Sequence, residues 1–114
     1  MRRPERIVGT VLFLLLGSVG NAGAQGSERP LPDEDKGRRV AQTLCSGCHI
    51  VSSGQANAIA GVPSFAAIAN HAGQTPERLA GAIILPHPPM PGIQVTNTEL
   101  RDIIAYILSL KSAR

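Results

Sequence analysis

The 114-residue chain has apolar positions at helical spacing in several stretches, and residues that can cap a helix precede them. The first stretch follows Asp33, which can cap a helix that begins at about Glu34. This helix is expected to run into the cysteine pair that starts at Cys45. Its apolar stripe consists of Val40, Ala41 and Leu44.

Three more helices are predicted further along the chain. A short one starts at Ser64, and the next starts at Pro76 behind the capping residue Thr75. Residues 96–99 resemble a capping box, from which the last helix runs to about Leu110. The expected apolar positions are Phe65 and Ile68 in the short helix, Leu79, Ala80, Ile83 and Ile84 in the next, and Leu100, Ile103, Ile104, Ile107 and Leu108 in the last. No stretch alternates with a period of two for long enough to predict a strand, so the sequence predicts an all-α fold.

The N-terminal segment has a different pattern. Residues 1–6 are basic, residues 7–16 are almost wholly apolar, and residues 22–24 offer the small side chains of a cleavage site. A retained membrane anchor is the alternative, but the apolar run of residues 7–19 is shorter than the roughly 20 residues that a span needs. We therefore predict a signal peptide over residues 1–24 and one mature domain over residues 25–114.

Removal of that segment changes the charge of the protein. It takes away three of the 11 basic residues and one of the 8 acidic residues, so the mature charge is 8 minus 7, or +1, instead of +3. No basic run with interleaved aromatic residues remains, which leaves nucleic-acid binding without support. The charge is also too near zero to fix the sign of a partner.

The mature domain is short of large apolar side chains. It has no tryptophan, and Phe65 and Tyr106 are its aromatic residues once Phe13 has left with the signal. A domain of this size usually needs a disulfide, a metal or a cofactor to stabilise its core. A large, flat apolar cofactor would supply the missing apolar surface.

The segment Cys45-Ser46-Gly47-Cys48-His49 has the spacing of a c-type haem attachment site. Both thiols can bond to one porphyrin, and the histidine is then held beneath the iron. The alternatives are a thioredoxin-like redox pair, a short-loop disulfide and half of a zinc site. A disulfide that closes so small a loop adds little stability. Zinc would have only His71 and His87 as further nitrogen ligands.

Met90 is the candidate for the second axial ligand of the iron. It lies between Pro89 and Pro91 on a loop that prolines exclude from helix or central strand. A gap-filling core methionine is the alternative role, and His87 is the alternative ligand, ahead of His71. A histidine and a thioether saturate the iron and raise its potential, which favours electron transfer. An open or histidine-ligated face would favour gas sensing or peroxidase chemistry.

Taken together and in order, these features resemble a class I cytochrome c, specifically a small bacterial monohaem cytochrome exported to the periplasm. The resemblance extends from about residue 36 to residue 111. It rests on Gly37 eight residues before Cys45, the attachment motif, Pro63-Ser64-Phe65, Pro88-Pro89-Met90-Pro91, and the terminal segment 105–110. It implies three to five helices around one covalently attached haem c.

The resemblance also implies roles for individual residues. Cys45 and Cys48 would hold the haem, with His49 as the proximal iron ligand and Met90 as the distal one. The Pro63 carbonyl would accept a hydrogen bond from the proximal imidazole. Gly37 and Tyr106 would mark the crossing of the first and last helices. On periodicity, the expected pocket walls are Phe65, Leu79, Ile83, Ile93, Leu100 and Ile104, and an ordinary core position is the alternative for each of them.

The expected function is periplasmic transfer of single electrons between redox proteins. A dehydrogenase would be the donor and an oxidase or another cytochrome the acceptor, with no enzymatic activity and no stable membrane insertion after signal cleavage. A permanent cytochrome subunit of a periplasmic dehydrogenase or oxidase complex is the first alternative. A ligand-binding sensor and a haem-free thiol-redox protein are the others.

Overall fold

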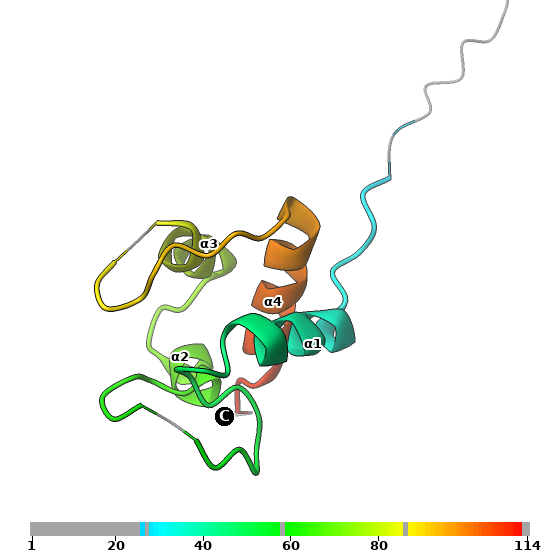
Figure 1. The fold of residues 1–114 in the computed structure, drawn as a ribbon. Helices are drawn as coiled ribbons and strands as arrows, with labels where there is room; N and C mark the ends of the chain where they lie inside the picture. Colours follow the sequence, from blue (N-terminus) through cyan, green and yellow to red (C-terminus); the bar gives the residue numbers. More distant parts are fainter. Residues whose placement is uncertain (1–25, 27, 58, 86, 113–114) are drawn as a thin grey trace, which may run out of the picture.

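The computed structural model describes residues 26, 28–57, 59–85 and 87–112, so the predicted signal peptide lies outside the described residues. The helices are α1 (Glu34–Leu44), α2 (Phe65–Asn70), α3 (Pro76–Ile84) and α4 (Asn97–Ser109) (Figure 1). No strand occurs in the described part of the chain. The predicted all-α fold is therefore confirmed.

Each helix begins directly after a capping residue, at the predicted start or within one residue of it. The side chains of Asp33, Ser64 and Thr75 accept hydrogen bonds from backbone N–H groups in the first turns of α1, α2 and α3. At α4 the capping box is complete: the Thr96 hydroxyl accepts from the Glu99 N–H, and the Glu99 carboxylate accepts from the Thr96 N–H. These bonds satisfy N–H groups that have no partner within the helix.

Helices α1 and α4 cross at Gly37, where their backbones come into close contact. A methyl group at Gly37 would overlap the Asp102 carbonyl group and lie 2.9 Å from the Ile103 nitrogen. Glycine is therefore required at this position for packing. Tyr106 lies one turn further along α4, where its hydroxyl donates a 2.5 Å hydrogen bond to the Val51 carbonyl.

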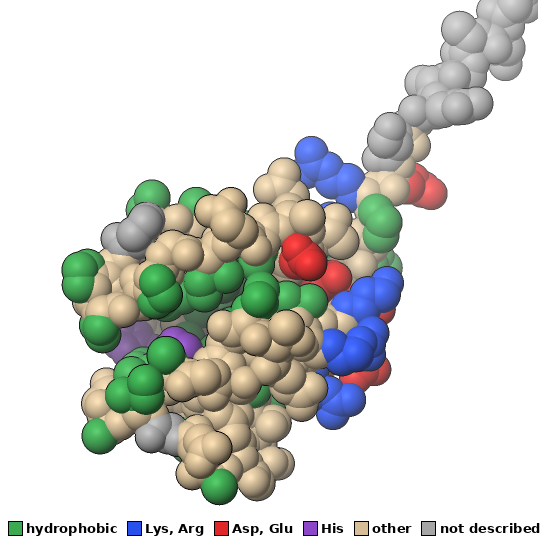
Figure 2. Space-filling view, viewed as in Figure 1, with side chains coloured by type: hydrophobic (Ala, Val, Ile, Leu, Met, Phe, Trp, Pro, Cys, Tyr) green, Lys and Arg blue, Asp and Glu red, His purple; other side chains and the backbone are tan. Residues whose placement is uncertain are grey.

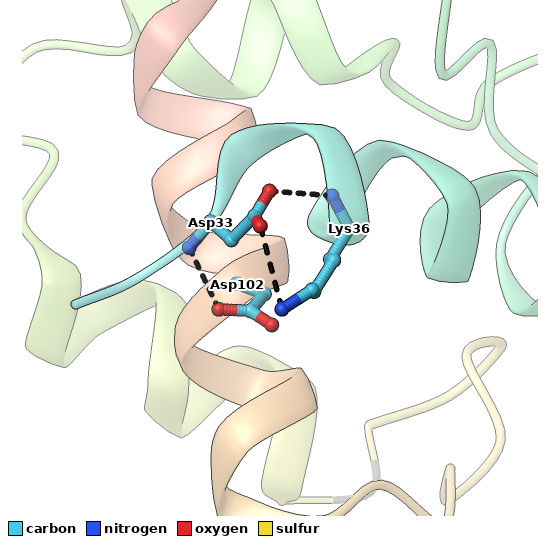
Figure 3. A network of polar contacts seen from close by, with 3 residues as sticks. All are labelled: Asp33, Lys36 and Asp102. Carbon is cyan, nitrogen blue, oxygen red and sulfur yellow. Dashed lines mark hydrogen bonds and ion pairs between the residues drawn. The ribbon is translucent and has the colours of Figure 1, made fainter. Parts of the chain in front are cut away.

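A buried carboxylate joins the start of α1 to α4. The Asp102 side chain is buried, and its Oδ1 accepts a 2.8 Å hydrogen bond from the Asp33 backbone N–H (Figure 3). Asp33 in turn caps α1 through the Lys36 N–H at 2.9 Å and pairs with the Lys36 Nζ at 3.5 Å. Because a buried carboxylate is costly without partners, this bond fixes where α1 begins on α4.

The core lies on α4 and is small. Its centre includes the Phe65 and Tyr106 rings, with centroids 6.3 Å apart. The buried apolar residues are Ala41, Val51, Phe65, Ala69, Leu79, Leu100, Ile103, Ile104, Tyr106 and Ile107. Most belong to α4 or face it, so the side of the domain that holds the cysteine motif is left with an open hollow.

Candidate functional site

A cavity of about 660 Å³ is lined by the cysteine motif, α2, α3 and the loop after α3. The motif and α2 lie on one side and α3 with its loop on the other (Figure 1), and the space-filling view shows a hollow between them (Figure 2). Its walls are mainly apolar. Arg78 is the one Lys, Arg, Asp or Glu among the described residues that line it. The wall residues include Leu44, Ile59, Phe65, Ile68, Leu79, Ile83, Pro89, Ile93, Val95, Ile103 and Ile107.

The pocket-wall prediction was correct for α2, α3 and the loop but wrong for α4. Leu100 and Ile104 are buried core residues and are not part of the lining. Ile103 and Ile107 line the cavity in their place. All four belong to one apolar stripe, and helical periodicity does not tell which edge of a stripe faces a cavity.

The turn after α1 brings Cys45, Cys48 and His49 to this cavity. Cys45 is the C-cap of α1, and its carbonyl accepts hydrogen bonds from the Cys48 N–H at 3.2 Å and the His49 N–H at 2.9 Å. The two thiols are free, Cys45 half-buried and Cys48 exposed. Burial raises the pKa of the Cys45 thiol to about 11. A thiol-redox nucleophile needs a lowered pKa, so this environment does not favour the thioredoxin-like alternative.

The imidazole of His49 is oriented by a backbone carbonyl. Its Nδ1 lies 2.6 Å from the Pro63 carbonyl oxygen. Because a carbonyl can only accept, Nδ1 is the protonated nitrogen, and Nε2 keeps a free lone pair for a metal. The Phe65 ring packs against the imidazole with centroids 5.5 Å apart.

Gln55 is a site residue that the sequence did not reveal. The two hydrogens of its Nε2 are shared among the carbonyls of Ser46, His49 and Asn57, which lie 3.0, 2.7 and 3.0 Å away, and its Oε1 accepts from the Val51 N–H at 3.1 Å. One amide thus ties both ends of the motif to the loop that follows. A single glutamine in a loop of small residues gives no pattern by which this role could be found.

Met90 and His87 both reach the cavity from the loop after α3. Their backbones pair in an isolated antiparallel bridge, which folds the loop back at Pro88 and Pro89. Met90 is half-buried, whereas His87 is exposed and its Nδ1 lies 3.1 Å from the Leu85 carbonyl. The structure brings both candidate distal ligands to the cavity, and the choice between them stays a prediction.

His71 also lines the cavity, close to Gln74 and Arg78 in sequence. Its Nδ1 lies 2.9 Å from the Ala72 carbonyl, and the Arg78 guanidinium lies 3.5 Å from the Gly73 carbonyl. These side chains are the polar part of an otherwise apolar wall. Within the described ranges, no three His, Cys, Asp or Glu side chains cluster in a way that could hold a metal ion, so the zinc alternative gains no support.

The residues around the cavity fit a flat apolar macrocycle with a central metal. Two free thiols, an imidazole with a free nitrogen and a thioether all line one space whose remaining walls are mainly hydrocarbon. In agreement with this, residues 34–111 match the family model described as Cytochrome c. The chain belongs to the cytochrome c family.

A relative supports the same assignment. Cytochrome c-552 of Bradyrhizobium diazoefficiens is 44% identical to the chain over 79 residues, which cover 69% of this chain and 76% of the relative. No solved structure matches the chain closely enough to count as a relative. The protein is thus an electron-transfer cytochrome of the bacterial class I type, and its cofactor is a covalently bound haem c. Within the part that the structure describes, no helix is long and apolar enough to cross a membrane.

Proposed function

We propose that this cytochrome c shuttles single electrons in the periplasm through a haem held by Cys45 and Cys48, with His49 and Met90 as axial iron ligands. When bound, the haem iron takes up and releases one electron by alternating between the ferric and ferrous states. The observation that carries the proposal is the cavity itself, because these four side chains line a single space from the motif and from the distal loop.

The protein residues would tune and protect the site. The Pro63 carbonyl keeps the His49 imidazole in one orientation and increases its basicity. The soft Met90 thioether favours the reduced iron and raises the potential. Two side-chain ligands leave no position for a substrate, which fits a carrier and not an enzyme. The apolar walls limit access of water and so reduce reorganisation of the surroundings when the charge changes.

Two arguments support the periplasm as the compartment. The first is the proposed signal peptide over residues 1–24, and the second is that bacterial c-type cytochromes are usually exported. Redox partners would be a donor dehydrogenase and an acceptor oxidase or cytochrome. Such encounters are typically small and transient. The alternative of a permanent enzyme subunit predicts co-elution with that enzyme when the native periplasmic protein is passed through a size-exclusion column.

The direct test is a potentiometric titration of the exported protein from a host that attaches haem. We expect a reversible one-electron transition, a sharp reduced band, and colour that stays with the protein after acid–acetone extraction. Ready binding of carbon monoxide by the ferrous form would contradict a saturated iron and favour a sensor. A colourless mature protein would contradict haem attachment and favour a thiol-redox function.

A further inference from the structure

Two histidines of the cavity have no role in the proposed iron ligation. All three histidines of the chain, His49, His71 and His87, line the cavity, and Figure 2 shows histidine side chains inside the hollow. His49 is the proposed proximal ligand, so two further imidazoles lie beside the same space. The neutral imidazole is the commonest metal ligand among protein side chains. Each of the two is therefore a candidate for a second role at the iron.

The imidazole of His87 is oriented so that it can bind a metal. Its Nδ1 lies 3.1 Å from the Leu85 carbonyl oxygen. Because a carbonyl can only accept, Nδ1 carries the proton and Nε2 keeps a free lone pair. The His49 ring has the same arrangement, with its Nδ1 2.6 Å from the Pro63 carbonyl oxygen. His87 thus offers the same donor atom, in the same tautomer, as the proposed proximal ligand.

His87 and Met90 lie opposite each other on one short loop. Their backbones form an antiparallel bridge, and both residues line the cavity. Residues directly opposite in an antiparallel pair carry their side chains on the same face, with Cβ atoms roughly 4.5–5.5 Å apart. Both side chains therefore leave the loop towards the same side, Met90 half-buried and His87 exposed. A rearrangement confined to this loop is sufficient to replace one by the other while the helices stay in place.

His71 is held in a different part of the wall. It is the C-cap residue of α2, and its N–H donates to the Ile68 carbonyl at 3.3 Å while its carbonyl accepts from the Gln74 N–H at 3.2 Å. The Gln74 side chain donates a further hydrogen bond of 2.9 Å to the Ile68 carbonyl. These bonds fix His71 at the connection of α2 and α3, so it does not follow a rearrangement of the loop after α3. The only lysines of the chain, Lys36 and Lys111, are not among the described residues that line the cavity.

We propose that His87 is a reserve ligand, which takes the distal iron position whenever Met90 leaves it. The proposal rests on the proposed function, since it requires an iron with Met90 as its resting ligand. The exchange breaks the bond between the iron and the Met90 sulfur and forms one to the lone pair of His87 Nε2, and no electron or proton is transferred. A thioether favours ferrous iron, whereas an imidazole nitrogen is a harder ligand. The exchange is therefore favoured in the oxidised protein, where it lowers the potential and keeps the iron ferric.

Removal of the resting ligand is the first test. It uses ferric holoprotein at one neutral pH, with electron paramagnetic resonance to report the spin state. We expect Met90→Ala to stay low-spin, with the signal of two nitrogen ligands. The double variant Met90→Ala/His87→Ala should lose this low-spin signal, become high-spin and bind carbon monoxide readily in its ferrous form. Met90→Ala/His71→Ala is the matched control, and it should stay low-spin like Met90→Ala.

Warming of the ferric wild type is the second test, and it does not depend on the folding of any Met90 variant. The weak near-infrared sulfur-to-iron band should fade before the helices unfold, as followed by circular dichroism, while the iron stays low-spin. Reduction should restore methionine ligation. In His87→Ala the band should fade together with a change to high-spin iron, whereas His71→Ala should behave like wild type.

High-spin iron in Met90→Ala would overturn the proposal, as would low-spin iron in Met90→Ala/His87→Ala. High-spin iron in Met90→Ala/His71→Ala would assign the reserve role to His71 and also overturn it. A sulfur-to-iron band that persists in the wild type until the helices unfold would show that no exchange occurs in the intact protein. A wild type that lacks this band before warming would instead contradict the proposed ligation by Met90, so the two ideas fail in different samples.

Discussion

The two loops that border the cavity are held by the protein to very different degrees. The loop from the cysteine motif to Pro63 is fixed by the Gln55 amide, which contacts three carbonyls and one N–H group. It is also fixed by the hydrogen bonds from the Tyr106 hydroxyl to the Val51 carbonyl and from the His49 Nδ1 to the Pro63 carbonyl. In the described residues 87–95 of the distal loop, the polar contacts are the His87–Met90 backbone bridge and the contact of the His87 Nδ1 with the Leu85 carbonyl.

This difference has a physical cause and a consequence. Prolines stiffen the distal loop by restricting the backbone, but they also remove N–H donors, so the loop cannot build a network like the proximal one. The His49 imidazole is therefore positioned by contacts with the protein. Under the proposed ligation, the Met90 thioether would depend on a stiff loop and on its bond to the iron, so we expect ligation to change first on this side.

The largest effect on stability is expected at the crossing of α1 and α4, since α1 leads into the proximal loop. Gly37→Ala would place a methyl group against the Asp102 backbone, which cannot move aside as a flexible side chain would. We expect a loss of roughly 3 kcal/mol of unfolding free energy, since overpacking against backbone lies at the upper end of such effects. Chemical denaturation of the holoprotein measures it.

Gly81→Ala is the matched control for that experiment. Gly81 lies within α3, and nothing lies within 4 Å of the methyl group that it would gain. It should stabilise the protein by up to about 1 kcal/mol through helix propensity. Equal destabilisation by both substitutions would contradict the close crossing of α1 and α4.

The next largest effect comes from a direct comparison of one substitution in each of the two loops. Gln55→Ala leaves three carbonyls and one N–H without their partner in the proximal loop, and should cost about 2 kcal/mol. It should also broaden the distribution of His49 orientations, which low-temperature electron paramagnetic resonance of the ferric protein detects. Gln94→Ala, at an exposed position of the distal loop, should change neither quantity. A similar loss of unfolding free energy in Gln55→Ala and Gln94→Ala would contradict the proposed difference between the two loops.

The smallest effect concerns pH and the caps at the starts of α1 and α4. Hydrogen bonds from the Thr96 backbone and hydroxyl lower the pKa of Glu99 below its usual 4.5, and the Lys36 backbone N–H does the same for Asp33 below 3.8. A lowered folded-state pKa gives stability that is present above the unfolded value and lost as the pH falls through the folded one. Glu99→Gln should therefore reduce the loss of helix stability in acid, followed by circular dichroism. An unchanged acid profile would argue against this cap.

Local signals in the sequence predicted where the helices begin, but they did not predict the tertiary contacts. Asp33, Ser64, Thr75 and Thr96 mark the helix starts because a cap bonds to its own first turn. The role of Gln55 depends on contacts that only the folded loop creates. For the same reason the sequence placed Leu100 and Ile104 at the cavity, where Ile103 and Ile107 lie.

The choice between Met90 and His87 is the point at which the proposed site is most directly open to test. The measurement is the near-infrared spectrum of the ferric holoprotein for Met90→Ala and His87→Ala. We expect the weak sulfur-to-iron band to disappear in Met90→Ala and to remain in His87→Ala, with covalent haem retained in both. Loss of the band in His87→Ala together with its survival in Met90→Ala would contradict methionine ligation by Met90.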